Sequence, residues 1–390
     1  MCIRDSYCTK ATAEIARIIL LDAAKLQEED AAYKKKRHLR EGRKGPYPEV
    51  PLYTMADAEA TLPLFEGVEY DTPVRIADGV EASFHDAGHV LGSSMIKVIL
   101  GKGDAARNIV FSGDIGRWNR PMLEDPHIFK KPDYIVIEST YGDRTHNRSE
   151  NVAEDLATIV NETVKAGGNL IVPSFALQRA QEILFHMNAL LMDGRIPEID
   201  VYLDSPMASR ITEVYKQYEE LFDKEMQALV NRKLSPFTFP GLKFVQTVEE
   251  SKALNFLKKP SMIIAGSGMI TGGRVKHHVS NNISRPESTI MFIGYQARGT
   301  LGRLIMDGAK SIRLFNKPHV VRARIAQIGG FSAHADRDDL MRWLSGLTAK
   351  PKRIFVTHGE LNAAMAFRKH LETAGYSAMV PAYGDTVPLA

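Results

Sequence analysis

The sequence predicts a mixed α/β protein in which both ends of the chain form a β-rich region and the middle forms an α/β insertion. Short strand-like runs separated by Gly-, Asp- and Pro-containing turns occupy residues 68–140. Strands then alternate with helices up to about residue 265, which is typical of a mainly parallel sheet covered on both faces. A further helix, strand and helix follow residue 330.

The first element is a helix over residues 11–32, because its apolar residues recur at helical spacing on one face. These residues are Ile15, Ile18, Ile19, Ala23 and Leu26. Residues 36–50 contain two glycines and two prolines and are predicted to be a loop. The β-rich region then supplies four strands, at residues 80–85, 94–100, 108–112 and 134–138.

The insertion and the C-terminal part follow the same pattern of alternation. Helices are predicted at residues 149–166, 176–192, 207–231 and 248–257, and strands at 169–173, 199–203 and 261–265. The chain ends with a helix at 337–346, a strand at 353–357 and a helix at 360–373. Asp336 is placed to cap the first of these two helices.

The composition bounds the class of protein. With 44% hydrophobic and 25% charged residues, the chain can bury a large core, and no apolar run is long enough to cross a membrane. Only Cys2 and Cys8 occur, so we expect no disulfide framework and a cytoplasmic location. Residues 34–44 hold seven Lys or Arg against one Glu. We interpret this run as a solvated surface, with a phosphate-steering patch as the alternative.

Five segments each place a metal-binding or acidic residue in a tight turn. The residues are His89 in segment 86–93, Asp114 in 111–114, Glu138 in 137–142, His334 in 330–336 and His358 in 356–360. Strand ends at one edge of a sheet converge, and imidazole and carboxylate groups suit Zn²⁺ in a hydrolytic centre. Two such metals about 3.5–4 Å apart would clamp a phosphodiester and activate water. Each residue alone is more often structural or solvated, but the five in this order indicate one shared site.

In their order, these segments resemble the later motifs of metallo-β-lactamase-fold nucleases that carry a β-CASP insertion. The resemblance runs from about Tyr7 to the C-terminus. It implies an αββα metallo-β-lactamase fold, incomplete at its N-terminus, with an inserted α/β β-CASP domain of mainly parallel sheet. Residues 1–143 and 334–390 would form the first and last parts of the metallo-β-lactamase domain, and residues 144–333 the β-CASP domain.

The resemblance also implies a function, namely a zinc-dependent ribonuclease that hydrolyses single-stranded RNA in RNA processing or decay. His89, Asp114 and His358 match ligands of two Zn²⁺ ions, with Asp114 shared between them. A histidine at position 358 favours RNA-cleaving members, because DNA-directed members usually carry an aliphatic residue there. His334 would be the general acid, oriented and held protonated by Glu138.

Small-residue loops at strand ends supply further candidates, because backbone N–H groups and an Arg in such loops would hold phosphate. The candidate RNA- or phosphate-binding residues are Ser332, Arg274, Ser174, Ser205 and Arg298. The alternative is that these loops are tight connections without a ligand. The remaining nine histidines have no matching neighbours and are expected to be structural or exposed.

One family signature, His-x-His-x-Asp-His, does not occur in the sequence, and residues 1–6 match nothing in the family. We therefore expect a chain truncated at its N-terminus, with three of seven zinc-binding residues left. Because a catalytic zinc usually has three or more protein ligands, such a chain would bind zinc weakly and cleave little RNA.

Other functions are weighed against this one. A non-catalytic RNA-processing scaffold of the same family would lose metal-binding residues at scattered positions, whereas all five downstream positions are present. A thioesterase or lactamase would lack the insertion, and a DNA nuclease is disfavoured by His358. Endonuclease and 5′-exonuclease action both stay open, and the resemblance suggests a homodimer.

Overall fold

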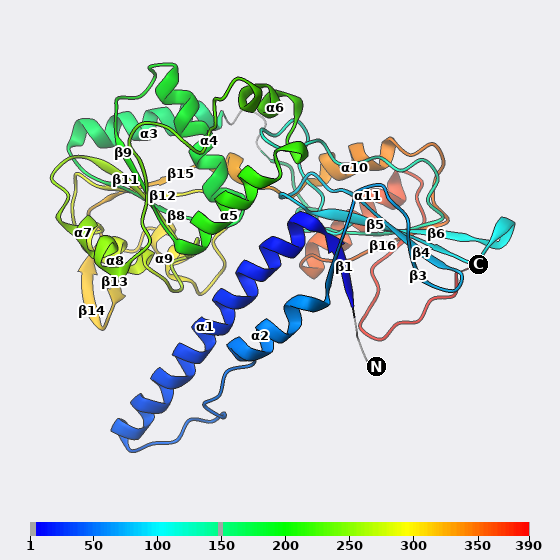
Figure 1. Ribbon diagram of the computed structural model, residues 1–390, viewed down its shortest axis with the longest axis horizontal. Coiled ribbons are helices and arrows are strands. Elements are labelled where there is room, and N and C mark those ends of the chain that lie inside the picture. Colours follow the sequence, from blue (N-terminus) through cyan, green and yellow to red (C-terminus); the bar gives the residue numbers. More distant parts are fainter. Residues whose placement is uncertain (1–4, 147–150, 390) are drawn as a thin grey trace.

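The computed structural model describes residues 5–146 and 151–389, which form two lobes and a helical arm that projects from their junction (Figure 1). Cys2 and the first two residues of the predicted helix 149–166 lie outside these ranges. Each lobe is built on one large sheet. In the described part of the chain, no helix combines the length and apolar character needed to cross a membrane.

One lobe contains a seven-stranded sheet in the order β17-β16-β7-β6-β5-β4-β3. Its strands are β3 (Val74–Ala77), β4 (Val80–Asp86), β5 (Ser94–Leu100), β6 (Arg107–Phe111), β7 (Tyr134–Ile137), β16 (Arg353–Val356) and β17 (Ala378–Met379), and a short 3₁₀ turn, η2 (Gly103–Ala105), joins β5 to β6. Neighbours are antiparallel from β3 to β6 and parallel from β6 to β17. The strands predicted in both parts of the β-rich region are confirmed to within one or two residues.

Helices α10 (Arg337–Ser345) and α11 (Leu361–Thr373) pack on this sheet. Trp343 of α10 and Phe367 of α11 are fully buried in a core with Ile135 and Ile354 of the central strands. Burial of side chains this large contributes about 2–3 kcal/mol each. The same core therefore fixes the ends of β7 and β16, where Glu138 and His358 follow. Asp336 caps α10 as predicted, in a capping box with Asp339.

The second lobe contains a six-stranded sheet in the order β10-β9-β11-β8-β12-β15, in which every pair is parallel. Its strands are β8 (Leu170–Pro173), β9 (Asp200–Asp204), β10 (Leu242–Phe244), β11 (Ser261–Ala265), β12 (Thr289–Phe292) and β15 (Arg324–Gln327). Alternate residues of β11 enter different cores, Ile264 on one face and Ile263 on the other. Both faces of the sheet are thus covered, as the alternating pattern predicts.

Helices surround this parallel sheet. They are α3 (Val152–Ala166), α4 (Arg179–Met192), α5 (Pro206–Gln217), α6 (Lys224–Asn231), α7 (Val248–Ala253), α8 (Val275–Asn282) and α9 (Leu301–Met306), with the short turns η3 (Glu219–Leu221), η4 (Leu254–Phe256) and η5 (Gly329–Phe331) and a hairpin of β13 (Ser311–Leu314) and β14 (Lys317–Val320). The single helix predicted at 207–231 is wrong, because α5 ends at Gln217 and α6 begins only after Asp223, its N-cap.

The arm consists of α1 (Lys10–Glu41) and α2 (Met55–Thr61), followed by η1 (Leu62–Leu64), with β1 (Ser6–Thr9) and β2 (Phe65–Val68) paired in parallel at its base. α1 is longer than predicted, and residues 36–41 are helical rather than loop. The reason is that Lys, Arg and Glu are good helix formers, so the helix ends only at Gly42, in the left-handed conformation.

The chain leaves the seven-stranded sheet after β7 and returns to it at β16, and every strand of the six-stranded sheet lies between these two. On this basis we propose that the boundaries expected at residues 144 and 333 separate the two lobes.

Candidate active site

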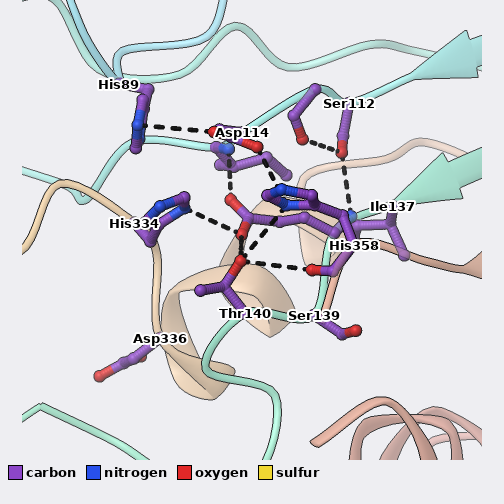
Figure 2. A network of polar contacts seen from close by, with 12 residues as sticks. His89, Ser112, Asp114, Ile137, Ser139, Thr140, His334, Asp336 and His358 are labelled. Carbon is purple, nitrogen blue, oxygen red and sulfur yellow. Dashed lines mark hydrogen bonds and ion pairs between the residues drawn. The ribbon is translucent and has the colours of Figure 1, made fainter. Parts of the chain in front are cut away.

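The five residues singled out in the sequence meet where the two lobes join. His89, Asp114, Glu138 and His358 follow the ends of β4, β6, β7 and β16, and Figure 2 shows the labelled histidines around Asp114. His334 comes instead from the loop that leaves the six-stranded sheet. That loop is fixed to the Asp114 loop because the Ala335 N–H donates to the Ile115 carbonyl, N to O 2.8 Å.

Close backbone packing holds the His89 loop against the Asp114 loop. Gly88 has a positive φ of 63°, and a Cβ there would lie 2.8 Å from the Glu124 carbonyl oxygen. A Cβ on Gly116 would lie only 1.9 Å from the Gly88 carbonyl oxygen. Only glycine fits at either position, so the small residues beside His89 permit the approach of the two loops.

Asp114 lies between two imidazoles. His358 Nδ1 is 3.1 Å from Asp114 Oδ1, and His89 Nε2 is 3.7 Å from Asp114 Oδ2. Candidate ligand atoms of His89, Asp114 and His334 all lie within 4.8 Å of one another, and so do those of Asp114, Glu138 and His358. Asp114 therefore belongs to both groups, and its role as a shared metal ligand stays a prediction.

Glu138 is buried and bonded on both carboxylate oxygens. Oε1 accepts the Ile115 N–H at 2.5 Å, and Oε2 accepts the Thr140 hydroxyl at 2.6 Å. Oε2 also lies 3.1 Å from His334 Nδ1. The Ser112 hydroxyl oxygen accepts the Glu138 N–H at 3.1 Å. With its own position fixed in this way, Glu138 fixes the ring of His334 through Nδ1 and leaves Nε2 as the free nitrogen.

The two inner histidines differ in their affinity for protons. Burial lowers the pKa of His334, but the hydrogen bond and charge of Glu138, with the charge of Asp114, outweigh burial and raise the pKa above the usual histidine value. Burial, reinforced by the neighbouring His334, lowers the pKa of His89 to about 3. His89 is therefore a neutral imidazole at neutral pH, the form that binds a metal, whereas His334 favours its protonated form.

The donor set fits a divalent metal. His89 Nδ1 is buried without a hydrogen bond of normal geometry, and both His89 and His358 face Asp114. Among residues 5–146 and 151–389, no Lys or Arg forms an ion pair with Asp114. A carboxylate between two imidazoles, without a competing Lys or Arg among the described residues, is the kind of donor set that Zn²⁺ prefers.

The predicted phosphate-binding residues are scattered around the insertion. Ser174 is buried and its hydroxyl donates to the Phe175 carbonyl at 2.9 Å, while Ser205 caps α5. Ser332 is partly exposed, two residues before His334. Arg298 is exposed. Arg298 lines a cavity together with Thr140 and Gly359, and a phosphate-binding role for any of the four stays a prediction.

Arg274 has a different environment from the one expected. Its guanidinium donates to Asp204 Oδ1 at 2.6 Å and to the Gln246 carbonyl at 2.9 Å. The side chain of Asp204 is fully buried, and that of Arg274 is mostly buried. Because these acceptors already hold the guanidinium, Arg274 is oriented toward the protein rather than toward a ligand. The phosphate contact predicted for it has no structural support.

A cavity of about 740 Å³ adjoins the site and was not foreseen from the sequence, apart from Arg298. Its lining includes Thr140, Tyr141, Arg144, Tyr295, Arg298 and Arg303. The first three belong to the segment after β7, and the last three to the loop after β12 and to α9. Thr140 and Tyr141 lie in the segment 137–142 quoted around Glu138, whereas Arg144, Tyr295 and Arg303 were not singled out in the sequence.

His146, one of the remaining histidines, forms its contacts close to the site. Its Nε2 lies 3.1 Å from the His334 carbonyl oxygen, and its backbone N–H donates to Asp336 Oδ2 at 2.7 Å. These contacts connect the described end of the segment after β7 to the His334 loop. His278, in contrast, is a buried structural histidine, as expected.

Comparison with known proteins gives two domain matches and a set of relatives. Residues 180–305 match the Beta-Casp domain, and residues 318–381 match the Zn-dependent metallo-hydrolase RNA specificity domain. A ribonuclease of Thermus thermophilus is 34% identical over 384 residues, which cover 98% of this chain and 81% of the relative. An RNase J-like protein of Methanocaldococcus jannaschii is 28% identical, over 98% of this chain and 83% of the relative.

Archaeal relatives named transcription termination factor FttA are also similar. The one from Methanosarcina mazei is 30% identical over 92% of this chain, and the chain spans about half of its length, 55%. Extent and identity of the match to the Thermus ribonuclease, together with the two domain matches, establish the family. The chain belongs to the β-CASP ribonucleases of metallo-β-lactamase fold, which are metal-dependent enzymes of RNA processing.

Proposed function

We propose that this site hydrolyses the phosphodiester bonds of single-stranded RNA. The observation that carries the proposal is the position of Asp114 between His89 and His358, with His334 oriented beside them by Glu138. The relatives named ribonucleases support RNA as the substrate. Because residues from both lobes form the site, an RNA strand that passes between the lobes would reach it.

His89, Asp114 and His358 would hold zinc, and the shared carboxylate of Asp114 is suited to two ions. Bound zinc would polarise the scissile phosphate and lower the pKa of an attacking water. With three ligands from the described residues, we expect this chain to bind zinc weakly. Zinc measured per chain by elemental analysis tests this, and two tightly held ions would contradict it.

His334 would supply the proton for the leaving oxygen. Its Nδ1 is held by Glu138, so the transferable proton is the one on Nε2. The hydrogen bond and charge of Glu138 raise the pKa of His334 and so favour its protonated form, which a general acid requires. Glu138 acts here as a positioning residue, because its own oxygens are occupied by Ile115, Thr140 and His334.

The cavity beside the site would receive nucleotides next to the scissile bond. Its volume lies within the range of small-molecule sites, and Tyr295 is 52% exposed, so a base can stack on its ring. Arg298 is placed to contact a phosphate, and Ser332, beside His334, to contact another. Ser174 and Ser205 stay weaker candidates, because their hydroxyls already bond the backbone. Such contacts predict salt-sensitive binding with little sequence preference.

Replacing His334 by Ala in the zinc-loaded protein tests the proposal. We expect cleavage of a single-stranded RNA to fall about 10²–10⁴-fold, the contribution of a general acid, with unchanged zinc content. His370→Ala, which changes an exposed histidine on α11, is the matched control and should cleave normally. Loss of zinc from His334→Ala would make His334 a ligand instead.

Two outcomes would change the functional assignment. Cleavage is expected to be slow because zinc is bound weakly, so a non-catalytic scaffold is favoured if the zinc-loaded protein binds RNA and cleaves it no faster than His334→Ala does. If it cleaves single-stranded DNA as fast as RNA of equal length, RNA specificity fails. We also infer a cytoplasmic location from the scarcity of cysteine, and a homodimer from the family. Fractionation and light scattering test these two points.

A further inference from the structure

We propose that the tip of the arm is a second RNA-binding surface, which holds the phosphate backbone of strands long enough to extend beyond the active site. The arm tip is defined as residues 33–47, the end of α1 and the loop that follows it. This inference rests on the proposed function, because it takes RNA as the substrate of the site.

The arm connects its tip rigidly to the active-site region. The hydroxyls of Thr9 and Thr12, at the start of α1, each donate to the Gly92 carbonyl at 2.7 Å, and Gly92 belongs to the His89 loop. Along its first half, α1 packs against α5, with Arg210 3.5 Å from Asp22. The 32 residues of α1 span about 48 Å. Figure 1 shows its far end lying away from both lobes.

The arm tip carries positive charge that the protein does not neutralise. Arg37 and Arg43 share the single carboxylate of Glu41. Within the part of the chain that the structure describes, no ion pair is found for the other helical cations of the tip. These are Lys34, Lys35, Lys36 and Arg40. A dense group of free cations on one projecting helix is the electrostatic pattern that attracts a nucleic-acid backbone.

An acidic band at residues 28–30 lies between the tip and the base of the arm. Part of this band is already engaged, since Glu28 accepts the Met55 N–H at 2.9 Å and Glu29 lies 4.0 Å from Lys25. Its negative charge would repel RNA along the middle of the helix. RNA would therefore contact the arm at its tip, and only a strand long enough to bridge from the site would do so.

Exposed aromatic rings stand among these cations. Tyr33 is 63% exposed and Tyr47 is 81% exposed. Rings in a basic surface offer stacking platforms for unpaired bases. A helix that docks on another protein would instead present a continuous apolar stripe, whereas α1 over its whole length does not segregate its apolar and charged residues. The charge and the rings together favour RNA over a protein partner.

The test compares RNA binding by fluorescence anisotropy for strands of about 6 and about 30 nucleotides, since stacked phosphates rise about 3.4 Å each and only the longer strand can reach the tip. The arm variant is Lys34→Gln, Lys35→Gln, Lys36→Gln and Arg40→Gln. The matched control is Lys258→Gln, Lys259→Gln, Lys310→Gln and Lys317→Gln, four exposed lysines of the six-stranded lobe. Circular dichroism checks that both variants keep their helices.

We expect the arm variant to bind the long RNA about tenfold more weakly at moderate salt, and to bind the short RNA as the wild type does. The slope of log affinity against log salt concentration should be smaller in magnitude by about 3, because each of the four lost phosphate contacts contributes roughly 0.7. Unchanged affinity for the long RNA, or equal weakening by the control, would overturn the inference. A shift from dimer to monomer with unchanged RNA affinity would make the tip a contact between two copies.

Failure of the proposed function would give a different result. In that case the zinc-loaded wild type would cleave the short RNA no faster than His334→Ala does, whatever the arm variant does. Normal cleavage of the short RNA with arm-independent binding of the long one would contradict the arm surface alone.

Discussion

Asp114 and Asp204, one in each lobe, both lie against histidines but use the same side chains in opposite ways. In the seven-stranded lobe, Asp114 is 38% exposed and faces two imidazoles across 3.1 and 3.7 Å. In the six-stranded lobe, Asp204 is fully buried at the end of β9. Its Oδ2 lies 2.6 Å from His278 Nε2 and also accepts the Ser251 hydroxyl, and its Oδ1 accepts from Arg274.

The difference between the clusters is the degree of pairing. Every oxygen of Asp204 is bonded, as a buried charge requires, so this cluster ties β9 to α7 and α8. Asp114 faces two imidazoles, at 3.1 and 3.7 Å, and forms no ion pair with a Lys or Arg among the described residues. Its charge is therefore available to an added ion. We infer that incomplete pairing at a strand end indicates a functional site, and complete pairing a structural one.

The largest expected effect is a loss of RNA cleavage when Asp114 is changed. Asp114→Asn should lower RNA cleavage by the zinc-loaded protein about a thousandfold, because a bound metal supplies several kcal/mol of transition-state stabilisation. Its unfolding free energy should change little, since Asp114 is partly exposed and no Lys or Arg among the described residues forms an ion pair with it. Cleavage assays and urea unfolding measure the two quantities. A strongly destabilised variant would place Asp114 with the structural class.

The next largest effect is a loss of stability when Asp204 is changed. Asp204→Asn should lower the free energy of unfolding by about 3 kcal/mol, because it leaves the Arg274 guanidinium without its counter-charge and removes a carboxylate oxygen that bonds the buried His278. Asp200→Asn, at the other end of the same strand, is the control. Its partner Lys243 lies 3.0 Å away on the surface, so the loss should be under about 1 kcal/mol. Equal losses in urea unfolding would remove the distinction between the clusters.

A smaller effect depends on pH. Burial raises the pKa of Asp204, but the hydrogen bonds from His278, Ser251 and Arg274 outweigh it and lower the pKa below its ordinary value of 3.8. A group with a depressed folded pKa stabilises the protein above the unfolded pKa, and that contribution is lost as the pH falls through the folded value. The stability difference between wild type and Asp204→Asn should thus shrink below about pH 4. A difference that is constant from pH 6 to pH 3 would contradict the assigned shift.

The two clusters also differ in how far the sequence could predict them. His89, Asp114 and His358 were found because each stands in a short turn directly after a strand, a local pattern. The arrangement around Asp204 was missed, and Arg274 was expected to bind phosphate, because its partner lies 70 residues earlier. Pairing across that distance follows from the parallel register of β9 and β11, which local patterns do not encode.

The same reason explains what was missed in the fold and around the site. Strand positions follow from local apolar runs. The helix predicted at residues 11–32 was too short, because the charged residues at the end of α1 are good helix formers but continue no apolar pattern. The cavity could not be predicted, since Tyr141 and Tyr295 come from different lobes and line one cavity only when the lobes join. The contact of His146 with the His334 loop likewise depends on the tertiary fold.

The smallest effect tests whether partial pairing also identifies residues that bind substrate. Arg298 is exposed in the cavity, and no ion pair is found for it in the described ranges, whereas Arg303, in the same cavity, contacts Asp307 at 2.9 Å. Arg298→Gln should weaken RNA binding about threefold to tenfold and reduce its salt dependence by about 0.7, the value for one phosphate contact. Arg303→Gln should do less, because its guanidinium already has a carboxylate partner. If titrations over a range of salt concentrations give Arg303→Gln the larger effect, pairing within the free protein does not predict which arginine holds the substrate.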